Sequence, residues 1–243
     1  MAGCSGAWAT LRLENWSMRN ESDKVKRSRL ALVGMSGSGK TFWTRKLAAA
    51  GWTAVSCDDL IEERLAPRLT AGGYAGINGV AAWMGWPDSS TYAEREAEYL
   101  AEEIAIVDEY LRALEADASG TPMVLDTTGS VIYAQKNILM RLRRQMTVVH
   151  LASTEQDQQL LVSRYLHDPK PVLWRGTFHV KDQEEPRETV ARCYPLLIAA
   201  RRKSYETLAH CSVQVAELRA IGGESSRGVD GFLQKIGEQT KDA

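Results

Sequence analysis

An eight-residue segment near the start of the chain constrains the fold more than any other. Residues 34–41 read GMSGSGKT and match the pattern G-x-x-x-x-G-K-[ST] at every fixed position. An apolar run at residues 30–33 precedes the segment, and a helical stretch at residues 41–50 follows it. Strand, glycine-rich loop and helix therefore stand in the order that a phosphate-binding loop (P-loop) requires, and a chance glycine-rich turn is the weaker interpretation.

The residue types of this loop suit a polyphosphate. Glycines let the backbone wrap tightly, so that successive N–H groups and the positive end of the following helix dipole face phosphate oxygens. Lys40 is expected to reach the β- and γ-phosphates, and the Thr41 hydroxyl is expected to bind Mg²⁺. The loop residues predicted to hold a nucleoside triphosphate are Gly34, Ser36, Gly37, Ser38, Gly39, Lys40 and Thr41.

The rest of the composition excludes several classes of partner. A chain of 243 residues fits one domain with tails or with one large insertion. The net charge of -1 gives no general attraction to nucleic acid or to an anionic membrane. No run of eighteen apolar residues marks a membrane span. We expect no nucleic-acid or membrane partner, and we leave the oligomeric state open with a monomer as the default.

The cysteines and the N-terminal residues bear on location. Cys4, Cys57, Cys193 and Cys211 form no C-x-x-C pair, which favours neither a zinc site nor a disulfide framework and suits a reducing compartment. Residues 1–28 lack the apolar core of a secretory signal and are expected to form a mobile tail. A cytoplasmic location is expected, with organelle targeting by the tail left open.

Short apolar segments alternate with longer helical ones along the chain, which predicts an α/β fold with a parallel sheet covered by helices. The predicted strands are residues 29–33, 53–57, 122–126, 146–151 and 212–215. The predicted helices after the P-loop include residues 58–65, 91–116 and 190–209.

Two long connections interrupt this alternation within a predicted domain of residues 29–215. Residues 66–118 are too long for a simple crossover and are predicted to form a helical substrate-binding insertion. Residues 168–188 combine proline, glycine and charge, which predicts an irregular lid. Residues 216–243 are expected to be a C-terminal tail with a weak helix around residues 232–236.

Two acidic residues stand where predicted strands end. Asp126 follows the apolar run of residues 123–125 and is predicted to support Mg²⁺, although an aspartate here can also cap a turn. Asp58 follows the second strand at the edge where ligands bind in open α/β sheets. It is predicted to hold or deprotonate an acceptor hydroxyl, and helix N-capping is the alternative.

Basic residues gather around the predicted lid, where a closing cation stabilises charge on a transferring phosphoryl group. Taken singly, each is also compatible with a solvated surface role, as for most charged side chains. The four histidines show no metal-ligand spacing and are interpreted as structural or surface residues. The basic residues in question are Arg164, Lys170, Arg175, Arg187, Arg192, Arg201 and Arg202.

From about residue 30 to residue 215 the chain resembles the shikimate kinase family, within the nucleoside-monophosphate-kinase-like P-loop fold. The resemblance implies a five-stranded parallel sheet of order 2-3-1-4-5 with a substrate-binding insertion and a lid. The family's D-x-D-x-x-I-E motif resembles residues 56–62, so that Asp58 matches the acid that binds acceptor hydroxyls. Gly129 is the retained residue of a glycine triplet, and the lid motif R-P-L-L resembles residues 170–173, beginning at Lys170.

Two arginines also carry over from the resemblance. Arg164 is similar to the arginine that stacks near adenine. Arg201 begins a match to R-x-x-x-Y, which implies that it partners a carboxylate of the acceptor and contributes to catalysis.

The departures from the family pattern concentrate in the residues expected to bind the acceptor, whereas the P-loop matches fully. Ser56 replaces the first acid of the second-strand motif, and Asp126 stands where the family has a small residue and can restore that charge. The segment F-R-x-x-E is matched by residues 92–96, where Ala93 replaces the arginine that clamps an acceptor carboxylate, unless Arg95 reaches in from the next helical turn.

The sequence therefore favours ATP- and Mg²⁺-dependent phosphorylation of a hydroxyl on a small polar metabolite, with shikimate as the leading acceptor. A kinase for a sugar acid or nucleoside is one alternative. A non-catalytic, nucleotide-binding regulatory protein is the other.

Overall fold

The computed structural model describes residues 28–117, 119–221 and 227–240. The predicted N-terminal tail, apart from Ser28, lies outside the described residues, as do residues 222–226 and 241–243 of the predicted C-terminal tail. Across the described ranges, no helix combines the length and apolar character needed to cross a membrane.

A five-stranded parallel sheet forms the centre of the molecule, in the order β2-β3-β1-β4-β5. The predicted α/β class and strand order are confirmed. Each strand begins and ends within one residue of its predicted bounds, because short apolar segments between helices are typical of buried parallel strands. The strands are β1 (Arg29–Val33), β2 (Thr53–Ser56), β3 (Met123–Asp126), β4 (Thr147–Ala152) and β5 (Cys211–Gln214).

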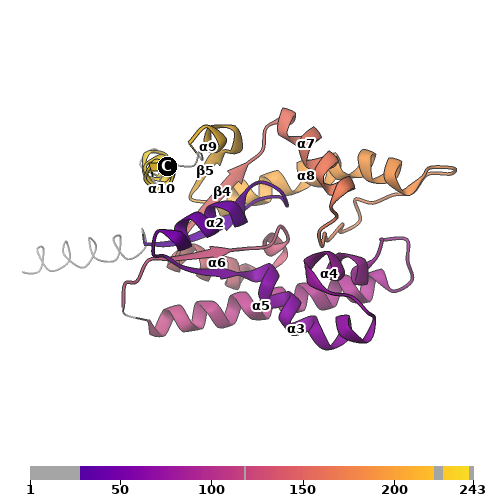
Figure 1. Ribbon diagram of the computed structural model, residues 1–243, viewed down its shortest axis with the longest axis horizontal. Helices are drawn as coiled ribbons and strands as arrows, with labels where there is room; N and C mark the ends of the chain where they lie inside the picture. The colour runs from indigo at the N-terminus through magenta and orange to yellow at the C-terminus, as the bar shows by residue number, and fades with distance from the viewer. Residues whose placement is uncertain (1–27, 118, 222–226, 241–243) are drawn as a thin grey trace, which may run out of the picture.

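Helices cover both faces of the sheet (Figure 1). Leu30 and Leu32 of β1 pack into a cluster with α2, α9 and α10, whereas Ala31 and Val33 pack on the opposite side. That alternation follows from the two-residue period of a strand. The helices are α2 (Lys40–Ala49), α3 (Cys57–Ala71), α4 (Gly76–Met84), α5 (Tyr92–Ala116), α6 (Lys136–Gln145), α7 (Glu155–His167), α8 (Pro186–Leu208), α9 (Val215–Ile221) and α10 (Arg227–Gln239), with a 3₁₀ turn η1 (Val131–Tyr133).

The excursion between β2 and β3 consists of α3, α4 and α5. Helix α3 is longer than the predicted residues 58–65, since it continues through Pro67 to Ala71. Helix α5 returns along the sheet, and Arg29 at the start of β1 donates hydrogen bonds to the carbonyls of Leu114 (3.2 Å) and Asp117 (2.8 Å). This buried arginine ties the end of the excursion to the central strand.

The C-terminal residues contain more helix than the sequence pattern indicated. Helix α10 extends well beyond residues 232–236, and Phe232 is fully buried against Trp43 of α2. The two rings stack with centroids 4.4 Å apart. These helices complete the α2 side of the sheet and, by their position behind α2, support the helix that follows the P-loop.

Candidate active site

The P-loop has the backbone conformation that its glycines predict. Gly34, Gly37 and Gly39 have φ values of 146°, 80° and 98°, which side chains with a Cβ rarely adopt. A Cβ on Gly34 would also lie 2.9 Å from the carbonyl oxygen of Leu151. Gly39 caps α2, so that the loop leads directly into a helix N-terminus. The loop is therefore shaped to present N–H groups to an anion.

Lys40 lies inside this loop. Its Nζ donates hydrogen bonds to the carbonyl oxygens of Gly34 (3.0 Å) and Met35 (3.2 Å), and its side chain is buried. Its positive charge lowers the pKa values of Asp58 and Asp126, opposing the larger effect of burial at each carboxyl. The structure thus brings three predicted site residues into electrostatic contact.

Asp126 ends β3 in register with Leu32 of β1 and with Ser56 of β2. Burial raises the pKa of its carboxyl, while the Lys40 charge and a hydrogen bond with the Thr41 side chain lower it. Its Oδ1 is buried and has no hydrogen-bond partner among the described residues. An orphaned carboxylate oxygen beside a threonine hydroxyl fits a site for Mg²⁺, which needs only one or two protein ligands when phosphates and water supply the others.

Ser56 explains one departure from the family pattern. Its side chain accepts a hydrogen bond from the backbone N–H of Asp59 (3.3 Å), which caps the N-terminus of α3. Asp58 is therefore spared the capping role that the sequence left open for it. Ser56, which stands where the shikimate kinase motif has an acid, therefore stabilises the start of α3, the helix that carries Asp58.

Asp58 is half-buried in the first turn of α3. The hydroxyl of Tyr99, on α5, donates a hydrogen bond to its Oδ1 (3.1 Å). Burial raises the pKa of Asp58 to about 6, against the lowering effects of Lys40 and of this hydrogen bond. A carboxylate with a pKa near neutrality is suited to proton transfer.

Glu103 is a site residue that the sequence reasoning missed. It is fully buried on α5 and accepts hydrogen bonds from the hydroxyls of Ser130 (2.5 Å) and Thr128. Burial raises its pKa to about 7, and the two hydroxyls lower it by a smaller amount. Glu103 therefore fixes the turn around Gly129 from the side of the insertion.

One signal could have revealed Glu103. Residues 99–103 read YLAEE, and their aromatic and glutamate positions have the same spacing as F-R-x-x-E. In residues 92–96, to which the sequence pattern assigns that segment, Tyr92 and Glu96 contact the predicted lid at Val172 and Arg175. When F-R-x-x-E is matched to residues 99–103, Leu100 stands at the position of the arginine. Neither this match nor the match to residues 92–96 supplies an arginine at that position.

Arg201 is buried beneath the turn at Gly129. Its guanidinium donates to the carbonyl oxygens of Gly129 (2.8 Å) and Leu173 (2.5 Å). The Tyr205 hydroxyl donates to the same Gly129 oxygen (2.5 Å). A Cβ at Gly129 would lie only 3.0 Å from Arg201 Nη1. Arg201 and Gly129 are thus adjacent, and Arg201 also ties the turn to the predicted lid.

The lid is anchored to the insertion through its first half. Val172, Leu173 and Trp174 are buried, and the Tyr92 hydroxyl accepts from the backbone N–H of Trp174 (3.0 Å) and donates to the carbonyl oxygen of Val172 (3.0 Å). The ring of Trp86 stacks on Phe178 with centroids 6.0 Å apart. Residues 171–178 of the predicted lid therefore pack against the predicted insertion.

Arg164 and Lys170 line a cleft beside the P-loop. Arg164 Nη1 donates to the carbonyl oxygen of Gly37 (3.1 Å). Lys170 Nζ donates to Oδ1 of Asn78 (2.6 Å) and pairs with Asp168 (2.9 Å). Both cations line one cleft with Ser36 and Gly37, so the structure places them beside the loop but apart from the turn at Gly129.

With this geometry established, a family model described as an AAA domain matches residues 30–164, more than half of the chain. The chain belongs to this AAA domain family. The matched part of the AAA domain includes the P-loop, Asp58, Asp126 and Gly129, whereas Lys170 and Arg201 follow it. The AAA domain match implies nucleotide binding.

Solved structures resemble the AAA domain protein over most of its length. A shikimate kinase from Acinetobacter baumannii, solved in complex with shikimate, is 23% identical with a TM-score of 0.53, and the match covers 85% of this chain and 89% of that one. A shikimate kinase from Aquifex aeolicus is 16% identical with a TM-score of 0.50, over 86% of this chain and 96% of that one. At these identities the likeness shows a shared fold. No curated protein matches the sequence.

Proposed function

We propose that this protein is an ATP-dependent kinase that phosphorylates a hydroxyl of a small polar metabolite. The observation that carries the proposal is the convergence of Lys40, Asp58 and Asp126 at one edge of the sheet, with the orphaned oxygen of Asp126 beside Thr41. A phosphate cradle, a metal-binding carboxylate and an acid of raised pKa are the groups that phosphoryl transfer to an alcohol requires.

Each residue has a role that follows from its position. The loop N–H groups and Lys40 bind and neutralise the β- and γ-phosphates, and Arg164 borders the nucleotide beside Gly37. Thr41 and Asp126 would hold Mg²⁺, which would supply electrostatic stabilisation of phosphoryl charge. Asp58 orients the acceptor hydroxyl and accepts its proton, while Tyr99 holds the carboxylate in place.

The turn at Gly129 forms the floor of the proposed acceptor site. Glu103 holds its hydroxyls, and Arg201 and Tyr205 hold its carbonyl. Arg201 is the cation nearest to this turn and is proposed to bind an anionic group of the acceptor. Lys170 is proposed to act from the lid side of the P-loop.

Shikimate is the leading acceptor, because the chain shares the fold of shikimate kinases and retains Asp58, Gly129 and Arg201. The alternative acceptors are a sugar acid or a nucleoside. Either Ala93 or Leu100 stands where the shikimate kinase family has the arginine that clamps a carboxylate. This loss favours an acceptor that needs only one strong cation.

A non-catalytic, nucleotide-binding regulatory role is the second candidate. One observation favours this role. Ser56 caps a helix at the position where the shikimate kinase family has an acid, so the site has one carboxylate fewer than in that family. The two candidates share the P-loop and differ in the acceptor half.

A coupled ADP-release assay distinguishes them. ATP and Mg²⁺ are supplied with shikimate, then with sugars, sugar acids and nucleosides, and ATP and GTP binding are measured in parallel by calorimetry. Acceptor-dependent ADP release supports the kinase, and its saturation identifies the acceptor. Tight ATP binding without turnover on any acceptor supports the regulatory role. If neither ATP nor GTP binds, both candidate functions are contradicted.

A further inference from the structure

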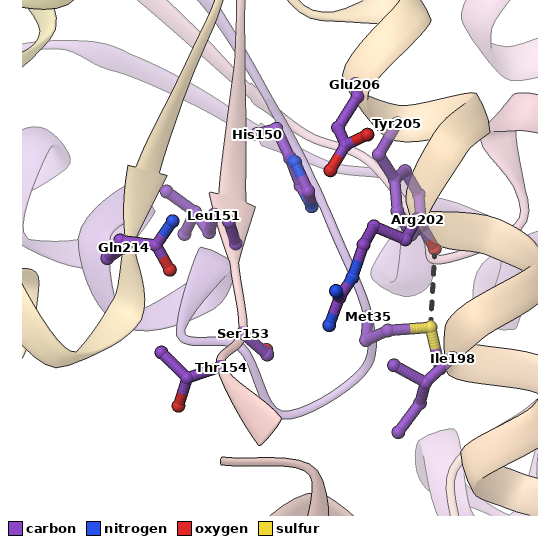
Figure 2. A pocket seen from close by; sticks show the side chains of 11 residues that line it. Met35, His150, Leu151, Ser153, Thr154, Ile198, Arg202, Tyr205, Glu206 and Gln214 are labelled. Atoms are coloured by element: carbon purple, nitrogen blue, oxygen red, sulfur yellow. Dashed lines mark hydrogen bonds between the residues drawn. The ribbon is translucent and has the colours of Figure 1, made fainter. Parts of the chain in front are cut away.

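A second cleft lies behind the P-loop, between the ends of β4 and β5 and helix α8 (Figure 2). We name it the β4–β5 groove. It has a volume of about 180 Å³ and shares no lining residue with the cleft of Arg164 and Lys170. Its lining side chains include Met35, His150, Thr154, Arg202, Glu206 and Gln214.

The floor of the groove is polar where the rest of this sheet face is apolar. On the α8 side, β1 contributes Ala31 and Val33, and β4 contributes Val148. Two residues further along β4, His150 occupies the same face, and Ser212 of β5 lies beside it. His150 and Ser212 make this part of the sheet face polar, and their side chains lie within hydrogen-bond distance of each other, as the cost of burying polar groups requires.

His150 supplies a buried polar side chain directed to the groove. It is 4% exposed, its ring stacks on Tyr205 with centroids 5.2 Å apart, and Nδ1 lies 3.2 Å from Ser212 Oγ. Nε2 makes no hydrogen bond with the part of the chain that the structure describes. Burial first, then the charges of Arg202 and Lys40, lowers its pKa to about 4, so the ring is neutral at physiological pH. Its remaining nitrogen can therefore hydrogen-bond a ligand.

Arg202 is the cation of the groove. In Figure 2 its side chain extends from α8 toward the strand ends, between His150 above and Met35 below. Its guanidinium makes no ion pair or hydrogen bond with residues 28–117, 119–221 or 227–240, although Glu206 lies one helical turn away and lines the same groove. An arginine without a partner, beside a neutral histidine and the hydroxyl of Thr154, matches the chemistry that recognises carboxylate or phosphate.

We propose that the β4–β5 groove is a second ligand site, which binds a compact anion bearing a carboxylate or phosphate group through Arg202 and His150. The volume is below the 300–1,000 Å³ typical of pockets for drug-sized ligands, which favours an anion smaller than a nucleotide. Glu206 at the same groove accepts a hydrogen bond from a hydroxyl or ammonium group of the anion. Because Met35 belongs to both the groove and the P-loop, the bound anion lies against the outer wall of the P-loop.

The test follows the groove by NMR, with inorganic phosphate and L-lactate as separate probes. The His150 ring and the Gln214 side-chain amide report binding, and they are followed in the natural protein and in three variants. Arg202→Gln removes the groove cation, Lys203→Gln removes an exposed cation next to it, and Lys40→Ala removes the P-loop cation. Arg202 and Lys203 are both exposed, so folding is expected to be unchanged.

Either probe is expected to shift both reporters, and Arg202→Gln is expected to weaken that binding about tenfold or more, as loss of a charge-assisted hydrogen bond implies. Lys203→Gln and Lys40→Ala should retain it. Binding by phosphate alone identifies a phosphate-bearing ligand, and binding by lactate alone identifies a carboxylate. No shift with either probe overturns the proposal, as does binding that survives Arg202→Gln or disappears in Lys40→Ala. The Lys40→Ala result separates this site from the nucleotide site, so the proposed kinase activity can fail without affecting it.

Discussion

The phosphate-donor half and the acceptor half of the candidate site are built in different ways. The donor half comes from one continuous segment, in which glycine backbone, Lys40 and the α2 N-terminus follow one another within a few residues. The acceptor half draws Asp58, Glu103, Gly129 and Arg201 from four separate segments. A motif in sequence predicts the first kind of site, whereas the second depends on contacts between distant elements.

The donor half should be the more sensitive to a single substitution. Lys40→Ala is expected to reduce turnover by about 1,000-fold or more, because the loop loses the cation that neutralises transferring phosphoryl charge. Turnover is measured in the ADP-release assay. Lys136→Ala, an exposed lysine at the start of α6, is the matched control and should leave the rate unchanged. Near-normal activity in Lys40→Ala would show that the P-loop is not the catalytic centre.

Asp58→Asn tests whether Asp58 accepts the proton of the acceptor hydroxyl during phosphoryl transfer. We expect kcat to fall about 100-fold, since the acceptor hydroxyl loses its base. With a pKa of about 6, Asp58 is ionised above that pH and protonated below it, so kcat/KM of the natural protein should fall as the pH drops below about 6. The variant should lack this limb. The exposed neighbour Asp59 provides the control Asp59→Asn, and a variant profile that keeps the limb would assign it to another group.

Gly129→Ala perturbs the acceptor half alone. The added methyl group would lie 3.0 Å from Arg201 Nη1 and displace the guanidinium or the turn. The KM for the acceptor should rise about tenfold with little change in the KM for ATP, because positioning is lost at one substrate only. Gly237→Ala on α10, where a methyl group meets no other atom, is the control. An equal rise in both KM values would remove the distinction between the halves.

Asp126→Asn tests the metal assignment in the donor half. An amide is a weaker Mg²⁺ ligand than a carboxylate, so the Mg²⁺ concentration for half-maximal activity should rise several-fold. The measurement is a magnesium titration at saturating ATP, with Asp230→Asn on α10 as control. An unchanged titration would return Asp126 to a structural role.

Glu103→Gln is expected to give the smallest change in rate. Its main effect should be on how the free energy of unfolding depends on pH. The folded protein raises the pKa of Glu103 from 4.5 to about 7, so it binds the proton more tightly than the unfolded chain does. The free energy of unfolding should therefore decrease as the pH rises from about 4.5 to about 7, by on the order of 3 kcal/mol. In Glu103→Gln that decrease should be smaller, as measured by urea unfolding across this range. The neighbouring Glu102→Gln should keep the slope of the natural protein, and an identical slope in Glu103→Gln would show that Glu103 does not titrate there.

The hydrophobic pattern and the loop motif were sufficient to predict an α/β fold with a parallel sheet and a P-loop. The strand positions follow from short apolar segments between helices, whereas the sheet order was predicted from the resemblance to the shikimate kinase family. The P-loop conformation also depends on local sequence, because glycine permits the positive φ values found at Gly34, Gly37 and Gly39 without steric cost.

The sequence by itself thus determined the sheet, the P-loop and the acids at the strand ends, since each depends on residues within a few positions of one another. Only the tertiary structure decided that Ser56 caps α3, that Glu103 rather than Glu96 holds the turn at Gly129, and that Arg201 joins this turn to the lid. It also decided that His150 and Arg202 meet in one groove. These contacts join residues tens of positions apart, and helices α5 and α8 each present several acids or arginines with the same local pattern. Which of them turns inward is set by packing against the sheet, and local sequence carries no record of that choice.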